Sequence, residues 1–127
     1  MQGIGIYKYA DGIVYEGQYQ RDAKMGYGYY KWTDERMYEG YWFKGKQHGL
    51  GVYSDPKKGI RYGLWEHGKR IKWYNEQEIE QINSGQYDYT CDLVSDEAAR
   101  FCDPGQLFER PEGIDEAIYE LKMQFKI

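Results

Sequence analysis

The chain repeats itself every 23 residues. A Tyr-Glu-Gly segment at residues 15–17 recurs at 38–40, and a Gly-x-Gly segment at 26–28 recurs at 49–51. The same step places another Gly-x-Gly segment at 3–5. Similarity at a fixed period is the signature of a repeat fold, in which each small unit contacts only its neighbours. A fold of stacked units is therefore predicted for the first part of the chain.

Each unit has the pattern of a β-hairpin. Residues 14–19 alternate with a period of two, which places Tyr15, Gly17 and Tyr19 on one face and polar residues on the other. A second alternating run follows at 26–32, after a short polar segment. Alternation of this kind is typical of strands, and two strands joined by a short polar segment form a hairpin.

Glycines at fixed places among aromatic residues indicate how the hairpins pack. Glycine is poor in strand interiors, but it has no Cβ and leaves a flat vacancy on the sheet. We expect Tyr and Trp rings to lie over such vacancies in neighbouring strands, on what we call the ring face. The repeat glycines in question are Gly17, Gly26, Gly28, Gly40, Gly49, Gly51 and Gly63.

One unit carries a complete family pattern. The pattern Y-E-G-x-W-x-x-G-x-x-H-G-x-G resembles the membrane occupation and recognition nexus (MORN) repeat, and it is formed by Tyr38, Glu39, Gly40, Trp42, Gly45, His48, Gly49 and Gly51. The resemblance covers residues 3 to about 74. It implies a mainly β fold, an elongated single-layer antiparallel sheet of stacked 23-residue hairpins with a short α-helical C-terminal tail.

The repeat array is expected to span residues 1–74. It divides into a half repeat at 3–14, repeats at 15–37 and 38–60, and a partial repeat at 61–74. Two departures from the pattern are expected to alter the sheet locally. The unit that begins at residue 15 has Tyr19 for Trp, Asp22 for Gly and Met25 for His, and the last unit has Lys72-Trp73-Tyr74 where Gly-x-Gly should fall, which suggests a capping strand.

The remaining residues, 75–127, form an acidic tail. The array carries 13 Lys and Arg against 8 Asp and Glu, whereas the tail carries 4 against 13. Capping residues and apolar spacing predict helices near 76–82, 95–102 and 114–125, with loops between them. The first helix should bury Ile79 and Ile82. The last has a narrow apolar stripe for docking, which consists of Ile114, Ile118, Leu121 and Phe125.

The second face of the sheet is apolar as well. It carries Ile4, Ile6, Tyr27, Tyr29, Leu50, Val52 and Leu64. Leaving such a strip in water forgoes several kcal/mol, at roughly 25 cal/mol per Å². Two alternatives stay open: the tail helices fold back onto this face, or the face and the last helix dock a partner.

The function predicted is that of a non-enzymatic scaffold, a structural subunit of a cytoskeletal, ciliary or membrane-associated assembly. An aromatic groove would bind another protein, and its lining would consist of Tyr15, Tyr19, Tyr30, Trp32, Tyr38, Trp42, Tyr53 and Trp65. The first alternative is an adaptor for anionic phospholipid, with lipid contacts at Lys44, Lys46, Lys57, Lys58, Lys69 and Arg70. The second is a regulatory MORN fragment of a larger enzyme, because the array begins halfway through a unit.

Other classes of function find little support. The two His and two Cys have no paired short spacing, so no metal site is expected, and neither catalytic residues nor a cofactor is predicted. The net charge of +5 on the array is too modest for nucleic-acid binding. The sequence shows neither a membrane span nor a signal peptide, so we expect an intracellular, cytoplasmic protein with free thiols at Cys91 and Cys102.

Overall fold

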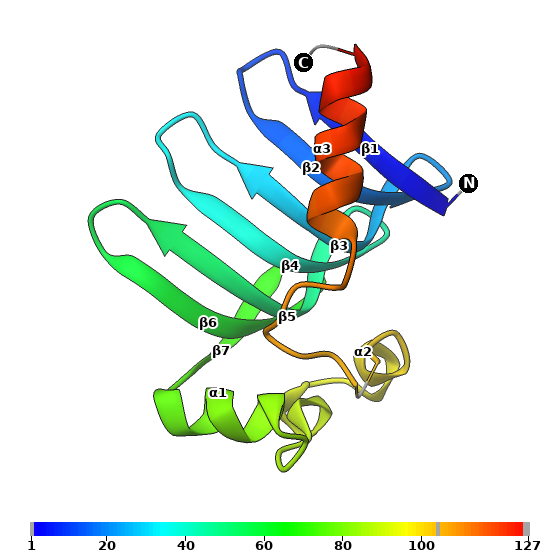
Figure 1. Cartoon of the computed structure of the whole chain (residues 1–127). Coiled ribbons are helices and arrows are strands. Elements are labelled where there is room, and N and C mark those ends of the chain that lie inside the picture. Colours follow the sequence, from blue (N-terminus) through cyan, green and yellow to red (C-terminus); the bar gives the residue numbers. More distant parts are fainter. Residues whose placement is uncertain (1, 104, 126–127) are drawn as a thin grey trace.

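The computed structural model describes residues 2–103 and 105–125 and contains one open antiparallel sheet (Figure 1). Its seven strands follow one another in space in the same order as in the sequence. The strands are β1 (Gln2–Lys8), β2 (Val14–Gln20), β3 (Ala23–Lys31), β4 (Met37–Phe43), β5 (Lys46–Asp55), β6 (Gly59–Glu66) and β7 (Lys69–Tyr74). This confirms the predicted fold class of stacked hairpins in a single layer.

Glycines stand opposite glycines across the array. The aligned pairs are Gly5–Gly17, Gly17–Gly28, Gly28–Gly40, Gly40–Gly51 and Gly51–Gly63. Because side chains in a strand alternate between faces with a period of two, this register places the glycines on one face together with the rings that stand two residues from them, such as Tyr15, Tyr38 and Trp42. The row of glycines therefore runs across the sheet as a shallow furrow on the ring face.

Tyrosine rings fill that furrow. The ring of Tyr38 lies where a side chain of Gly51 would be, and a methyl group there would come within 2.6 Å of Tyr38 Cζ. The Tyr38 hydroxyl donates to the carbonyl oxygen of Tyr41 at 3.0 Å. Tyr15 repeats the arrangement over Gly28, and both tyrosines are fully buried. Each ring thus gains apolar contact and a hydrogen bond without any second layer beneath it.

A glutamine side chain satisfies the backbone where β3 and β5 change register. Gly26 and Gly49 adopt the left-handed conformation at these places, with φ of 75° and 105°. The backbone amide that follows each glycine has no partner in the ladder there, so it needs another acceptor. Gln18 Oε1 accepts from Tyr27 N at 2.7 Å within the hairpin, whereas Leu50 N donates to Gln106 Oε1 of the tail at 3.1 Å.

Met25 performs the role that His48 has in the next unit. His48 Nδ1 accepts from the backbone N–H of His67 at 3.0 Å. In the preceding unit the Met25 sulfur accepts from the N–H of Lys44, also at 3.0 Å. The departure from the family pattern at residue 25 therefore keeps a weaker acceptor in the same place.

The last strand slips by one residue relative to the earlier units. Gly40 pairs with Gly51, so the 23-residue step would pair Gly63 with Tyr74, but Gly63 pairs with Trp73 instead. A one-residue slip moves each side chain to the opposite face. Trp73 therefore lies on the ring face beside Trp65, with ring centroids 5.7 Å apart, and it closes the furrow as a capping residue.

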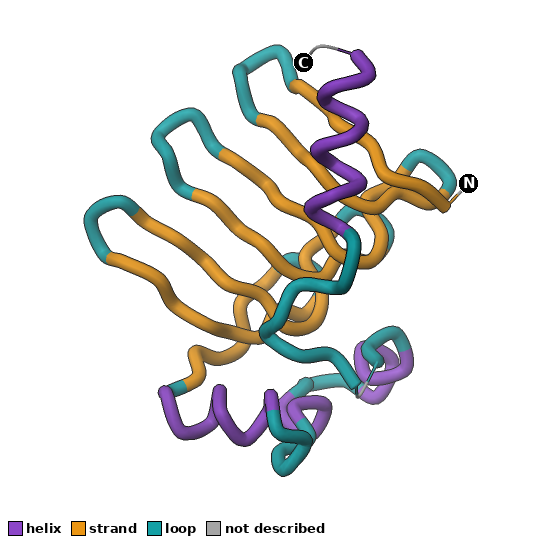
Figure 2. Tube along the Cα trace, in the orientation of Figure 1, coloured by secondary structure: helices purple, strands orange, loops and turns teal. Residues whose placement is uncertain are grey.

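The tail folds back over the second face (Figures 1 and 2). Its elements are α1 (Glu76–Asn83), the 3-10 helix η1 (Tyr89–Asp92), α2 (Asp96–Arg100) and α3 (Ile114–Phe125). One buried cluster joins Leu50 and Leu64 of the sheet to Ile82 and Tyr89 of the tail. The structure therefore confirms the alternative in which the tail folds back onto the sheet. The other alternative, in which the second face stays free for a partner, is wrong for the strips that the tail covers.

Helix α3 covers the N-terminal part of the second face. Ile114 and Ile118 are buried against Tyr27 and Tyr29. The expectation that Phe125 docks is wrong, because Phe125 is 62% exposed. It is the final residue of α3 and no member of the cluster, so the helix extends beyond the apolar strip before Phe125 is reached.

The other tail helices differ in detail from the sequence expectation. Helix α1 begins at an Asn75 capping box, in which the Asn75 side chain accepts from Glu78 N. Helix α2 is shorter than the expected 95–102, and η1 lies within a segment expected to be a loop. The thiol of Cys102 is buried in the cluster around Tyr89, and burial raises its pKa to about 11.

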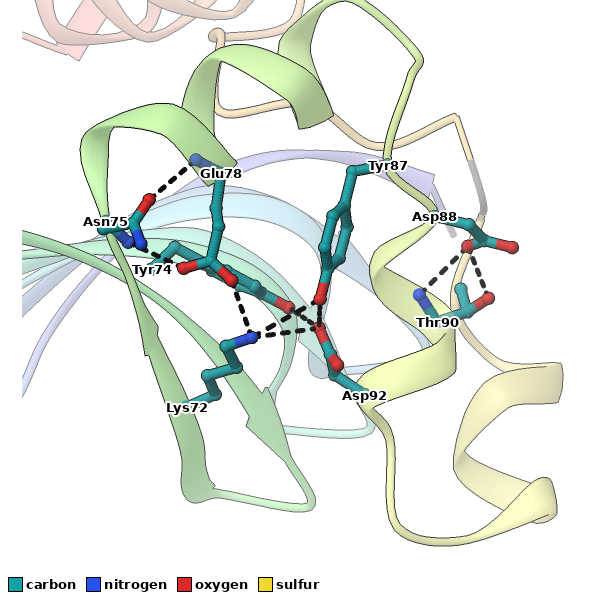
Figure 3. A network of polar contacts seen from close by, with 8 residues as sticks. All are labelled: Lys72, Tyr74, Asn75, Glu78, Tyr87, Asp88, Thr90 and Asp92. Atoms are coloured by element: carbon teal, nitrogen blue, oxygen red, sulfur yellow. Dashed lines mark hydrogen bonds and ion pairs between the residues drawn. The ribbon is translucent and has the colours of Figure 1, made fainter.

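Polar contacts fasten the first tail elements to the end of the sheet (Figure 3). Lys72 Nζ of β7 donates to Glu78 Oε2 of α1 at 2.8 Å. The hydroxyls of Tyr74 and Tyr87 both donate to Asp92 Oδ2, at 2.9 and 2.6 Å. This network links β7, α1 and η1, so the tail starts from a fixed position beside the last strand.

Candidate interaction surface

The ring face buries some of its aromatic residues and leaves others partly accessible. Of the eight predicted groove residues, Tyr15, Tyr38, Trp42 and Trp65 are buried and form the core of this face. The other four are half-buried and pack around that core: Tyr19, Tyr30, Trp32 and Tyr53. The first group holds the sheet together, and only the second group presents ring surface to a partner.

Two adjoining pockets lie on this face. The first has a volume of about 270 Å³, and its lining includes Tyr30, Trp32, Trp42 and Gln47. The second, of about 230 Å³, shares Trp32 and Gln47 with it and extends to Trp73. We call the two pockets together the ring channel. It runs over β3 to β7, across the strands rather than along one of them.

Cations lie over the rings of this face. Lys24 Nζ lies 5.5 Å from the centre of the Trp42 ring. The Arg61 and Arg70 guanidinium groups lie 4.2 and 4.7 Å from the centre of the Trp73 ring. Such contacts contribute roughly 0.5–1 kcal/mol each at exposed sites. They also hold the cationic groups against the rings, beside the channel.

The ring channel is electrostatically one-sided. Lys24, Lys46 and Arg70 line it, and none of the described residues that line it carries a carboxylate. Glu16 and Glu39 contact the tail across the second face, and Asp34 is paired with Arg36 in the turn that follows β3. A ligand in the channel therefore meets apolar ring surface and positive charge together.

A comparison with protein-family models identifies the array. The MORN repeat model matches residues 1–14, 15–35 and 38–60. This chain contains three MORN repeats. No curated protein matches the sequence closely enough to count as a relative. MORN repeats are non-enzymatic interaction repeats, and they generally serve as modules that contact other proteins or membranes.

The ring channel includes residues that the sequence pattern did not indicate. Trp73 lies in it only because of the slip in β7, and the 23-residue step would have placed it at the position of Leu50 on the second face. Lys24 and Gln47 precede Met25 and His48 directly, so each falls in the polar segment of its unit. The sequence feature that could have identified Lys24 and Gln47 is therefore their position just before the His position of each MORN unit.

A hollow of about 400 Å³ lies at the first unit, outside the channel. Its lining includes Gly3, Ile4, Tyr19 and Met25. Tyr19 stands where later MORN units have Trp. Its hydroxyl is buried and has no hydrogen-bond partner among the described residues, and burial raises its pKa to about 12. None of the described residues that line the hollow carries a charge.

The cations proposed for lipid contact do not gather in one place. Lys57 and Lys58 lie in the turn between β5 and β6. The other four, Lys44, Lys46, Lys69 and Arg70, lie at or beside the turns that follow β4 and β6, at the opposite ends of these strands. Within the described part of the chain, no helix has the length and apolar composition needed to cross a membrane.

The residues that hold α3 on the MORN sheet form two ionic clusters. Lys31 and Lys122 contact the two oxygens of the Glu16 carboxylate at 2.8 and 2.6 Å. Burial by itself would raise the pKa of Glu16, but the hydrogen bonds and charges of the two lysines outweigh it and hold that pKa below its usual value. Arg110 contacts Glu39 at 2.8 Å in the second cluster.

Proposed function

We propose that this protein is a scaffold that binds an extended segment of another protein in the ring channel. The observation that carries the proposal is the sorting of the two faces: the tail covers apolar strips of the second face, whereas half-buried rings and cations line an open channel on the ring face. Aromatic grooves are a recurrent means of binding extended peptides. The channel supplies ring surface for affinity and cations for orientation.

Trp32 is the residue on which we expect the affinity to depend most. It lines both pockets of the channel, and Arg36 lies 4.9 Å from the centre of its ring. Trp42, by contrast, is 7% exposed and donates from Nε1 to the Gly28 carbonyl oxygen, so its removal would damage the sheet itself. Trp32 can be truncated with less effect on the fold.

The test uses peptides selected from a displayed random library on the immobilised protein. Dissociation constants of the selected peptides are then measured for the wild type and for Trp32→Ala, Lys46→Ala and Tyr119→Ala. Loss of a central aromatic anchor costs about 2 kcal/mol or more, roughly a 30-fold weakening. Trp32→Ala should weaken binding more than Lys46→Ala does. Tyr119→Ala, which removes an exposed ring on α3, should leave the affinity unchanged.

A parallel experiment measures co-sedimentation with phosphatidylserine vesicles. The scaffold proposal predicts no pelleting at low salt. Pelleting that salt abolishes, and that is lost when Lys44, Lys46, Lys69 and Arg70 are changed to Glu, would establish a lipid adaptor instead. Peptides that lose affinity with Tyr119→Ala but not with Trp32→Ala would also contradict the proposal.

A further inference from the structure

The two edge strands of the described sheet are protected unequally. Strand β7 carries Lys69, Arg70 and Lys72, and α1 follows it directly. Strand β1 is seven residues long and has one charged residue, Lys8, at its end. Charged side chains are a common means by which proteins prevent an exposed edge from pairing with another chain. Strand β1 therefore has the less protected edge.

The backbone groups on the free edge of β1 can be identified. Tyr9 N donates to the Ile13 carbonyl oxygen at 2.8 Å, so residues 9 and 13 form a hydrogen-bonded pair between β1 and β2. Hydrogen-bonded and non-bonded pairs alternate along an antiparallel ladder. The odd-numbered residues of β1 therefore bond to β2, and the backbone groups of Ile4, Ile6 and Lys8 point to the free edge.

The next unit of the repeat shows how the backbone groups on such an edge pair with another strand. Trp32 N donates to the Arg36 carbonyl oxygen at 3.0 Å, so the even-numbered residues of β3 bond to β4. The odd-numbered residues of β3 that pair with β2 in the ladder, Tyr29 and Lys31, therefore bond to it. Ile6 and Lys8 stand 23 residues before these two. Strand β1 thus presents at Ile6 and Lys8 the same backbone groups that β3 uses to bind β2, whereas Ile4 corresponds to Tyr27, whose N–H donates to the Gln18 side chain.

We propose that β1 pairs with β1 of a second copy of this chain, in an antiparallel arrangement about a two-fold axis at Gly5. This register uses all of residues 2–8 and places Gly5 opposite Gly5 of the second copy. It therefore continues the row of paired glycines that runs through the array. A closed two-fold interface of this kind produces a dimer and does not extend into a polymer.

The pairs that this register creates are complementary. Ile4 stands opposite Ile6 of the second copy, and two β-branched residues form a favourable cross-strand pair. Tyr7, which is 53% exposed in the single chain, stands opposite Gly3 of the second copy. The array already contains aromatic residues opposite glycines, at Gly26–Trp42 and Gly49–Trp65. Lys8 is the one charged residue of β1 and does not stand opposite itself in this register, so no like charges oppose each other.

The first test measures molar mass by light scattering during size exclusion, over a range of concentrations of the full chain. The mass should rise from 15.1 kDa towards twice that value as the concentration rises. Ile6→Pro should stay monomeric at every concentration, because proline removes the outward N–H without removing a bond to β2. Ile6→Val keeps the N–H and should dimerise as the wild type does.

The second test measures amide hydrogen exchange of the unaltered chain by NMR, so it does not depend on the folding of the proline variant. The amides of Ile4, Ile6 and Lys8 should exchange fast in dilute protein and become protected as concentration rises. Those of Gly5 and Tyr7 should be protected throughout. A monomeric mass up to millimolar concentration would overturn the proposal, as would a dimer in which the Ile4 and Ile6 amides stay unprotected.

Discussion

At the scale of single residues, the fold depends on pairing a large ring with a residue that has no side chain. Tyr38 is fully buried although the sheet is one layer thick, because its ring occupies the vacancy at Gly51 and its hydroxyl bonds to the backbone. Burial also places the pKa of its hydroxyl well above the usual value, so the ring stays neutral. The glycine and the tyrosine are thus one structural unit.

The substitution Gly51→Ala tests this unit. The added methyl group would come within 2.6 Å of Tyr38 Cζ, and inserting a methyl group into a packed core costs about 1–3 kcal/mol. Urea denaturation should show a loss of that size in the free energy of unfolding. Gly105→Ala is the matched control, because its nearest atom outside the adjacent residues is the exposed Asp103 carboxylate at 3.2 Å. Equal stability of the two variants would contradict the account.

Glu16 provides a pH-dependent test at the same scale. Its pKa in the folded state lies below the usual 4.5, so the stability it contributes is present above that pH and is lost as pH falls through the folded-state pKa. Glu16→Gln should therefore destabilise the protein at pH 7 more than at pH 3. Denaturation curves of both proteins at the two pH values measure this difference. A destabilisation that does not change with pH would show that the two lysines do not hold the carboxylate charged.

At the scale of elements, the sequence predicts what is local. The period of two and the 23-residue step predict the hairpins, and the Asn75 capping box predicts the start of α1, because these signals lie within a few residues of what they specify. The path of the tail could not be predicted in this way. Phe125 shares the apolar stripe of α3 but lies beyond its partner surface, and Gln106 has no local feature that indicates its bond to Leu50.

Gln106 allows the role of the tail in the array to be measured. It gives the Leu50 N–H the acceptor that Gln18 gives Tyr27, and an unsatisfied buried group costs about 1–3 kcal/mol. Gln106→Ala should lower the free energy of unfolding by that amount. Gln86→Ala, at an exposed position of the tail, should have no measurable effect. Equal stability of Gln106→Ala and Gln86→Ala would contradict this prediction. It would mean that a solvent molecule accepts the hydrogen bond of the Leu50 N–H in place of Gln106.

At the scale of the whole molecule, the sheet has a closed face and an open one. The tail covers apolar strips of the second face with two buried clusters, so part of the acidic segment completes the core of the array. The repeat pattern predicts most rings of the open face. It does not separate the rings that support the sheet from those that line the channel, because that distinction depends on the register of each strand and on the slip that places Trp73 there.

Hydroxyl-radical footprinting with mass spectrometry measures this sorting of the two faces directly. In the free protein, the half-buried Trp32, Tyr53 and Trp73 should be oxidised, and a selected peptide should protect them. Tyr27 and Tyr29, which are 3% and 6% exposed beneath α3, should stay unmodified in both states. Oxidation of Tyr27 and Tyr29 in the free protein, or a peptide that leaves Trp32 and Trp73 as reactive as before, would contradict the account.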